Sequence, residues 1–320
     1  MDSIDNQNEY VRGVAYIYVF AVSLWQPFKT LTMNTFGGDW TENKIEILVE
    51  YAKAYLNIMN IYATKYNWKL LYFDGFAGSG FIKKGNDLDP KLIVGGATRI
   101  LEIEDPRPFD LFYFVEKETD NVELLKTNTK DKFPNKKIHI VNTDCNEKIQ
   151  SMSKFLSSTK GKSYKTLAYI DPCGMQLNWN SLEALEKLSV DVWILVPTGM
   201  GVNRLLKTNG EISDAWLTKL EIFLGMTKED ILSHFYNEKK VQTLFGEEKV
   251  VTKEEKAIEK SAKLYSKRLN KLFKFVSEPY ILKNKSNSVM FHFLMASNNS
   301  AAVKIANQIV KKYNQDNGTI

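Results

Sequence analysis

The clearest chemical signal in the sequence is a short acidic and glycine-rich segment, D-G-F-A-G-S-G, at residues 74–80. It directly follows residues 69–73, an apolar run that predicts a buried strand. In open α/β sheets, ligands bind at the carboxyl ends of the strands, and glycines there let the backbone turn tightly and approach a ligand. The segment therefore predicts a nucleotide-type pocket, and the alternative is a glycine-rich turn without a ligand.

The glycine spacing indicates which cofactor such a pocket would hold. The pattern is not G-x-G-x-x-G, and no Lys-Ser or Lys-Thr pair follows it as in a P-loop, so dinucleotides and ATP are disfavoured. An acid at a strand end followed by F-x-G-x-G suits S-adenosylmethionine, whose sulfonium and amino groups are positively charged and which has no pyrophosphate. The predicted cofactor contacts in this segment are Asp74, Gly75, Phe76, Ala77, Gly78 and Gly80.

Two further acids follow the next predicted strands. Glu116 ends the second strand, where it can accept hydrogen bonds from both ribose hydroxyls, and the alternative is an exposed acid that begins a helix. Asp144 ends the third strand, where it can accept from the adenine amino group, and the alternative is a helix N-cap, a position that favours Asp. Three acids at three consecutive strand ends indicate one pocket more strongly than any one of them.

The predicted catalytic residues follow the fourth strand and are Asp171, Pro172, Cys173 and Gly174. This Asp-Pro turn resembles the D-P-P-Y loop of enzymes that methylate exocyclic amino groups, in which the acid and a backbone carbonyl polarise the amine and an aromatic ring stacks on the base. The third and fourth positions here are cysteine and glycine, so that ring is missing. Either Trp179 supplies it, or the chemistry is not base-amine methylation. No His or Lys close in sequence would make a Cys173 thiolate, so a buried or lining thiol is favoured over a nucleophile.

The loop after the fifth predicted strand, P-T-G-M-G-V-N-R, adds two substrate-binding candidates. Asn203 and Arg204 can reach a phosphate or carboxylate, and the alternative is a loop with a helix cap. No metal site is predicted, because the three histidines have no ligand spacing. The only two cysteines cannot form a Cys-rich zinc site and suggest a reducing compartment.

These candidates require a sheet that brings successive strand ends together. Short runs rich in β-branched and aromatic residues alternate with helix-sized segments, which is typical of a parallel sheet covered on both faces. The predicted parallel strands are residues 69–73, 109–115, 137–141, 166–170 and 190–196, and residues 273–282 and 289–296 form a closing antiparallel hairpin. The predicted fold class is therefore α/β, a Rossmann-like class I methyltransferase sheet with a helical insertion, residues 203–270, before the hairpin.

Helices are predicted on both sides of this series of strands. Apolar residues recur at helical spacing over residues 41–66, after a capping pair, and a final helix is predicted over residues 301–313. Within the insertion, two amphipathic segments include residues 216–224 and 257–272.

The charge is distributed unevenly along the chain. The 320 residues contain 43 Lys+Arg and 38 Asp+Glu, a net charge of +5. Residues 203–320 contain 20 basic and 13 acidic residues, so the excess of +7 lies in the last third and the first 202 residues come to −2. Between residues 260 and 285, eight Lys and Arg face a single acid, Glu278. This segment would suit a surface that follows phosphates, and the alternative is a solvated helix face.

The first 33 residues are predicted to be an N-terminal extension, with Met33 as the alternative start of a domain over residues 34–320. The uncharged run 13–25 is shorter than the roughly 20 residues of a membrane span, so no membrane association is predicted. It resembles a secretory signal only faintly because the leader is acidic, and the cofactor motif indicates the cytoplasm.

Four motifs in this order resemble the three-Cys-motif partner protein family, TcmP. They are F-G-G-D-W-T-x-x-K (residues 36–44), D-G-F-A-G-S-G (74–80), D-P-C-G-M-Q (171–176) and P-T-G-M-G-V-N-R (197–204). The resemblance covers about residues 34–310. It implies a class I S-adenosylmethionine-dependent methyltransferase-like fold in bacteria, encoded beside a three-Cys-motif (phage Gp37/Gp68-like) protein, with mobile-element or defence associations. The family's D-P-F-G is D-P-C-G here, so Cys173 replaces an aromatic residue.

The resemblance also implies a role for the helix before the first strand. Lys44 on that helix belongs to a segment that closes over the methionine end of the cofactor, and the alternative is a surface lysine. The expected function is an S-adenosylmethionine-dependent methyltransferase acting on nucleic acid, DNA or RNA. The alternative is a catalytically weak methyltransferase-fold subunit that partners a three-Cys-motif protein in phage defence.

Overall fold

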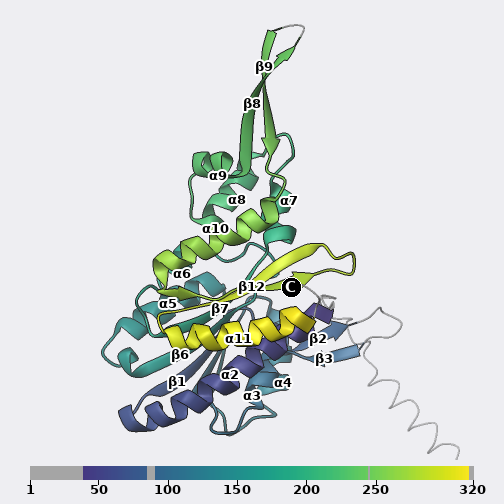
Figure 1. Cartoon of the computed structure of the whole chain (residues 1–320). Helices are drawn as coiled ribbons and strands as arrows, with labels where there is room; N and C mark the ends of the chain where they lie inside the picture. The colour runs from purple at the N-terminus through teal and green to yellow at the C-terminus, as the bar shows by residue number, and fades with distance from the viewer. Residues whose placement is uncertain (1–38, 85–90, 244–245, 317–320) are drawn as a thin grey trace, which may run out of the picture. The chain divides into compact units, whose positions relative to one another are not determined.

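The computed structural model describes residues 39–84, 91–243 and 246–316 (Figure 1). The predicted extension 1–33, the alternative start at Met33 and the F-G-G part of the first motif lie outside the described residues. The division of the chain into an extension and a domain over residues 34–320 therefore stays a prediction.

The centre of the described structure is a mostly parallel sheet. Its parallel strands are β1 (Lys69–Asp74), β4 (Leu111–Glu116), β5 (Ile138–Asn142), β6 (Tyr164–Ile170) and β7 (Val190–Val196). Strand β12 (Val289–Ser297) pairs antiparallel with β7, and β10 (Phe275–Val276) and β11 (Tyr280–Lys283) pair antiparallel with β12. The order is β10-β12-β7-β6-β1-β4-β5. This order, with an antiparallel strand after the fifth parallel one, confirms the predicted Rossmann-like methyltransferase sheet.

The order of the strands reverses at β1. The chain runs outward from β1 through β4 to β5 and then returns to place β6 on the other side of β1. In doubly wound sheets, the loops leave in opposite directions at such a switch point and open a crevice at the carboxyl ends of the two strands. The loops after β1 and β6 are those that carry the glycine-rich segment and the Asp-Pro turn.

Two hydrophobic cores cover the two faces of the sheet. Alternation along β1 sends Leu70 and Tyr72 into one core and Leu71 and Phe73 into the other. The first core lies under α2 (Asp39–Tyr66), α3 (Gly96–Leu101), α4 (Thr119–Thr129) and α11 (Ser300–Asp316), and α2 and α11 run side by side in Figure 1. The second lies under α5 (Cys145–Ser157), α6 (Trp179–Glu183) and the insertion. A short 3₁₀ turn, Gly161–Ser163, precedes β6.

The insertion contains the predicted helices and a β-hairpin that was not predicted. Its elements are α7 (Asn203–Leu205), α8 (Asp214–Leu224), α9 (Lys228–Phe235), β8 (Tyr236–Thr243), β9 (Gly246–Lys253) and α10 (Ala257–Leu272). Strands β8 and β9 pair antiparallel, and ion pairs such as Lys249–Glu238 join them across the hairpin. The expectation of a wholly helical insertion was wrong because this hairpin is largely exposed and has no apolar face to give a period-2 signal.

A second small hairpin was also missed. Strands β2 (Phe81–Lys84) and β3 (Lys91–Val94) pair antiparallel directly after the glycine-rich loop. No helix within the described ranges combines the length and apolarity that a membrane crossing needs.

The junction between β7 and the antiparallel strand β12 tests this architecture. Trp193 of β7 is fully buried, 5.4 Å from the ring of Tyr51 and 4.7 Å from the ring of Phe293. We expect Trp193→Ala to lower the free energy of unfolding by about 3–5 kcal/mol, because it leaves a cavity where a helix and two strands meet. Ile222→Ala, at a side chain 49% exposed on α8, should change it by about 0.5 kcal/mol. Equilibrium unfolding in urea measures both, and equal losses would contradict a core centred on this junction.

Candidate functional site

The glycine-rich segment lies between the ends of three neighbouring strands. The backbone N–H of Gly75 donates to the carbonyl of Tyr169 on β6 at 2.9 Å, and the N–H of Ala77 donates to the carbonyl of Val115 on β4 at 3.0 Å. The loop after β1 is thereby bound to both neighbours of β1. These contacts fix the loop across the carboxyl ends of β6, β1 and β4, where the crevice is predicted.

Two of the glycines are required by the local geometry. A Cβ at Gly75 would overlap the Cys145 sulfur and lie 3.0 Å from Ile170 Cδ1, so no larger residue fits under the loop. Gly78 has a φ of +60°, which favours glycine, and a Cβ there would meet no atom of the described residues within 4 Å. The backbone at Gly78 therefore faces open space, as a ligand-binding loop requires.

Glu116 is buried beside this loop and not an exposed acid. Its side chain is 9% exposed, and its two oxygens accept hydrogen bonds from the N–H groups of Gly78 and Glu118, each at 2.8 Å. The carboxylate thus positions the glycine loop and retains lone pairs for a further donor, such as a ribose hydroxyl.

Asp144 is the N-cap of helix α5. This is the alternative that the sequence offered to a contact with adenine. It accepts hydrogen bonds from the backbone and side-chain nitrogens of Asn146 at 2.9 Å and lies 3.3 Å from Lys117 Nζ. Partial burial alone would raise the pKa of Asp144, but these hydrogen bonds outweigh it and lower the pKa. The residue is an ionised N-cap in the described structure, so a role toward adenine stays a prediction.

Asp171 forms the most specific contacts in the crevice. Its Oδ2 atom accepts hydrogen bonds from Lys44 Nζ at 2.5 Å and from the Tyr169 hydroxyl at 2.7 Å. Lys44 is 5% exposed, so the predicted cofactor-site lysine is buried in the cluster and the alternative, a surface position, is not what the structure shows. Among the described residues, no hydrogen bond reaches Oδ1, and the Asp171 side chain is 21% exposed. Two donors thus fix Oδ2 of Asp171, and Oδ1 can accept a hydrogen bond from a ligand.

Tyr169 is the residue in this arrangement that the sequence did not reveal. It reads as an ordinary strand residue, and only the side of β6 on which it lies brings its hydroxyl to Asp171. Burial, with a contribution from the Asp171 charge, raises the pKa of its phenol, so it stays a protonated donor.

Asp74 is an almost fully buried carboxyl, 2% exposed, that accepts the N–H of Phe76 at 3.1 Å. Burial raises its pKa to about 8, and the charges of Asp171 and Glu116 add to this against the opposing effects of the Phe76 amide and of Lys44. The site brings three acids together around one lysine. Burial, with the neighbouring acid charges, therefore favours the protonated form of Asp74 at neutral pH.

The predicted stacking residue does not lie in this cluster. Trp179 is 4% exposed, with the Tyr265 ring edge-on at 5.4 Å and the Arg268 guanidinium 4.7 Å from its own ring centroid. Both contacts come from α10 of the insertion, so the ring is occupied in packing and is not free for a base. Cys173 is exposed beside Asp171, and partial desolvation followed by the Asp171 charge raises the pKa of its thiol, as expected of a lining thiol.

The loop after β7 packs against the Asp-Pro loop. A Cβ at Gly201, in the π-helical turn Thr198–Val202, would lie 3.0 Å from Met175 Cγ. Asn203 and Arg204 follow in α7, where the Asn203 carbonyl accepts a hydrogen bond from Lys253 Nζ at 3.0 Å and the Arg204 side chain is exposed. Their predicted contact with a substrate stays a prediction.

Asn146 joins two of these loops and was not singled out by sequence. Its side-chain nitrogen donates to the carbonyl of Gln176 at 2.8 Å, and its side-chain oxygen accepts the N–H of Asn178 at 2.8 Å. It therefore binds the start of α5 to the segment that follows Asp171. Within the described ranges, no group of three or more His, Cys, Asp and Glu side chains is arranged to hold a metal ion.

No protein-family model matches the chain, and no curated protein matches it. Among solved structures, protein LPL1258 from Legionella pneumophila str. Philadelphia 1, of family model DUF519, is similar with 13% identity over 87% of this chain and 94% of its own, at a TM-score of 0.45. Trm1 from Pyrococcus horikoshii, in complex with S-adenosyl-L-methionine, has 12% identity over 89% of this chain and 76% of its own, at a TM-score of 0.37. An S-adenosylmethionine-dependent methyltransferase from Clostridium acetobutylicum ATCC 824 has 9% identity over 90% of this chain and 99% of its own, at a TM-score of 0.32.

The assignment of the fold rests on strand order and pairing, and not on these distant similarities. The resemblance to the three-Cys-motif partner family stays a prediction.

The buried Asp74 carboxyl predicts a pH dependence of stability. Its folded pKa, about 8, lies above the ordinary value of 3.8, so between about pH 4 and 8 the folded state binds a proton that the unfolded state does not. Stability from this group is therefore present at low pH and is lost as the pH rises toward 8. Asp74→Asn should remove this loss. The free energy of unfolding of the variant, relative to that of wild type, should therefore rise with pH by at most about 1.4 kcal/mol per pH unit.

Urea unfolding of both proteins from pH 5 to pH 8.5 measures this difference. Asp144→Asn is the matched control, because the lowered pKa of Asp144 places its titration below this range. Parallel stability curves for wild type and Asp74→Asn would contradict the assignment.

Proposed function

We propose that this chain is an S-adenosylmethionine-dependent methyltransferase that acts on a nitrogen atom of nucleic acid. The observation that carries the proposal is the state of Asp171. Lys44 and Tyr169 hold one of its oxygens, and the other is open at the switch point of the sheet, beside a glycine loop with room for a ligand.

The charges of the crevice suit this cofactor. Asp171 contacts the Lys44 ammonium, and the charges of Asp171, Glu116 and Lys44 all act on Asp74, so a ligand with positive charge lowers the electrostatic repulsion among the acids. The N–H groups of Gly78 and Glu118 already donate to Glu116, so these two are not available to hold a pyrophosphate. When bound, S-adenosylmethionine supplies an electrophilic methyl group.

Asp171 is suited to orient the acceptor. An amino group that donates a hydrogen bond to Oδ1 directs its lone pair away from the carboxylate, and the same oxygen can take the proton that the nitrogen loses. Lys44 and Tyr169 prevent the carboxylate from rotating, because both donate to the opposite oxygen. The backbone of Pro172, Cys173 and Gly174 completes the edge on which the acceptor lies.

The insertion supports a nucleic-acid substrate. Lys263, Lys267 and Lys271 recur every fourth residue on α10, so they share one face of the helix, and all three are exposed. None of them forms an ion pair with another residue in the described part of the chain. Other basic residues of this helix have structural partners: Lys260 pairs with Glu254 at 2.9 Å, and Arg268 donates to the carbonyl of Gly225. The three exposed lysines therefore form the surface that suits a phosphate backbone.

A second candidate is a catalytically weak methyltransferase-fold subunit that partners a three-Cys-motif protein. It is favoured by the missing base-stacking ring, since Cys173 stands in the aromatic position and Trp179 is covered by α10. Both candidates imply a cytoplasmic protein of a bacterial mobile-element or defence system.

Replacement of Asp171 tests the catalytic proposal. Asp171→Asn keeps the shape of the side chain and removes its charge, so we expect methyl transfer to fall by about 10²–10⁴-fold. Binding of S-adenosylhomocysteine, measured by calorimetry, should change by less than about threefold, a difference of under 1 kcal/mol. The control, Asp131→Asn, removes a charge at an exposed position before β5 and should keep both methyl transfer and binding.

Labelled S-adenosylmethionine offered with separate DNA, RNA and protein pools identifies the acceptor. Label in DNA or RNA supports the proposal, and label in protein alone contradicts its nucleic-acid half. No binding of the cofactor or its demethylated product would refute it entirely. Binding without transfer to any pool, with co-purification of a three-Cys-motif protein, supports the second candidate.

The lysine face of α10 is tested by salt dependence. Lys263→Gln with Lys267→Gln should reduce the slope of log affinity against log salt for nucleic acid by about 1.4–1.8, because two phosphate contacts are lost. Lys304→Gln with Lys311→Gln removes the same charge from exposed positions on α11 and should leave the slope unchanged. Equal effects of the two double variants would indicate a general charge effect and exclude the α10 face as the binding surface.

A further inference from the structure

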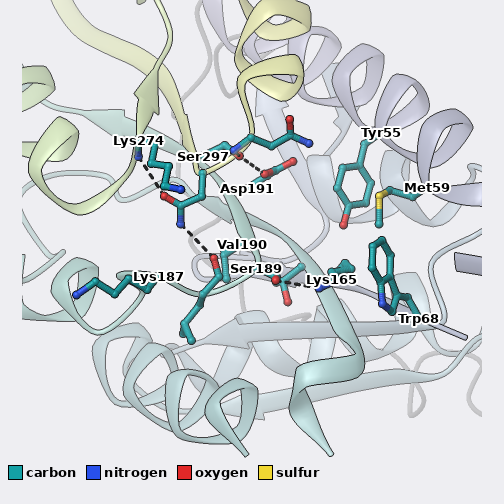
Figure 2. A pocket seen from close by; sticks show the side chains of 14 residues that line it. Tyr55, Met59, Trp68, Lys165, Lys187, Ser189, Val190, Asp191, Lys274 and Ser297 are labelled. Carbon is teal, nitrogen blue, oxygen red and sulfur yellow. Dashed lines mark hydrogen bonds between the residues drawn. The ribbon is translucent and has the colours of Figure 1, made fainter. Parts of the chain in front are cut away.

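A cavity of about 430 Å³ lies at the edge of the sheet opposite the crevice, where β6 and β7 begin and β12 ends (Figure 2). Thr166 of β6 lines this cavity, and Asp171 follows the other end of the same strand. Asp171 is five residue steps along extended chain from Thr166, or roughly 17 Å. The cavity is therefore a separate site from the crevice. Its lining consists of Tyr55, Met59, Trp68, Lys165, Thr166, Lys187, Leu188, Ser189, Val190, Asp191, Lys274, Ser297, Asn298 and Asn299.

Two buried hydroxyl groups line the cavity without a partner. The Tyr55 side chain is 8% exposed and Thr166 is fully buried, and neither hydroxyl has a hydrogen-bond partner within the described ranges. In Figure 2 the Tyr55 hydroxyl points toward Trp68 and Lys165. A buried polar group left without a partner costs about 1–3 kcal/mol, so a water molecule or a polar ligand group that hydrogen-bonds to these hydroxyls would stabilise the structure.

One wall of the cavity is aromatic and continues onto the surface. The ring centroid of Trp68 lies 5.0 Å from that of Tyr66, and Tyr66 stacks on Tyr62 at 6.4 Å with an interplanar angle of 5°. Tyr62 and Tyr66 are 45% and 50% exposed. Tyr62 also lies 6.5 Å from Trp68, so the three rings form a compact aromatic cluster beside the cavity, and aromatic rings of this kind stack with nucleobases.

The cavity is also positively charged. Lys165, Lys187 and Lys274 line it. Lys165 Nζ donates to Ser189 Oγ at 2.9 Å and lies 4.4 Å from the Trp68 ring centroid, and burial lowers its pKa. Lys187 has a carboxylate partner in Glu186 at 3.0 Å. The ammonium groups of Lys165 and Lys274 have none within the described structure.

Asp191 is the only acid in the lining, and its oxygens are already used. It accepts hydrogen bonds from Ser297 Oγ at 2.5 Å and from the Tyr51 hydroxyl at 2.9 Å. Burial raises the pKa of its carboxyl. The cavity therefore offers its free donors and its charge to an anion.

We propose that this cavity binds one nucleotide, with the base against Trp68 and Met59, the phosphate between Lys165 and Lys274, and the remaining polar groups on the hydroxyls of Tyr55 and Thr166. A small anion without a ring would leave the aromatic wall unused, and an apolar ligand would leave the ammonium groups and hydroxyls without partners. The nucleotide is either free or the end of a strand that continues over Tyr66 and Tyr62. This inference is independent of the proposed methyltransferase activity, because it uses the other edge of the sheet.

Calorimetry with AMP, GMP, CMP and UMP, each titrated separately into the full chain, tests this. We expect at least one to bind with a Kd under about 1 mM. Lys165→Met should raise that Kd about tenfold or more, because it removes a charged contact and keeps the packing on Trp68. Thr166→Val should raise it about fivefold while leaving the melting temperature unchanged or higher, because it removes a buried hydroxyl without a partner.

A matched pair of lysine variants distinguishes a direct effect on binding from an effect of misfolding. Lys274→Met should weaken binding, and Lys304→Met, at an exposed lysine of α11 outside the lining, should not.

A 5′-phosphorylated oligonucleotide, whose terminal base is that of the mononucleotide that binds most tightly, distinguishes a strand end from a free nucleotide. Binding more than about tenfold tighter than the mononucleotide supports a strand end, and equal binding supports a free nucleotide. Absence of binding by all five probes overturns the proposal. Binding that is unaffected by Lys165→Met and Lys274→Met, or inorganic phosphate that binds as tightly as the nucleotide, also overturns it.

Discussion

The structure depends on one constraint: β1 is buried on both faces and sits where the order of the strands reverses. A strand in that position must be apolar on both sides along its buried length, so after the exposed Lys69 the next charged side chain is Asp74, at its end. The loops after β1 and β6 then leave in opposite directions and open the crevice. Asp74, Glu116 and Asp171 meet there because the strands are parallel and all end at the same edge.

Three acids in one crevice need a counter-charge, and α2 provides it. This helix packs on the sheet through a continuous apolar stripe and delivers Lys44 to Asp171. A buried ion pair of this kind contributes little net stability, because both charges lose their water, but it specifies geometry. Here the ion pair fixes Oδ2 of Asp171 and leaves Oδ1 for a ligand. The contact that lowers the repulsion among the acids therefore also sets the side from which a ligand approaches Asp171.

The two edges of the sheet have opposite chemistry. The carboxyl edge gathers acids because strand ends supply Asp74, Glu116 and Asp171 there. The other edge gathers ammonium groups and unpartnered hydroxyls, and its only lining acid is already hydrogen-bonded. The insertion affects both the packing and the surface: α10 covers Trp179 with one face and exposes a row of lysines on another.

The sequence by itself determined the sheet and the acids at its edge. Runs such as 69–73 and 190–196 are apolar throughout because both faces of their strands are buried, and that pattern is local and needs no knowledge of the partners. Tertiary structure alone decided which side chains meet. The partnership of Lys44 and Tyr169 with Asp171, the covering of Trp179 by a helix about ninety residues later, and the cavity bounded by Trp68, Lys165 and Ser297 all join residues from distant segments. The exposed β8–β9 hairpin had no burial to leave a pattern, so only its backbone pairing reveals it.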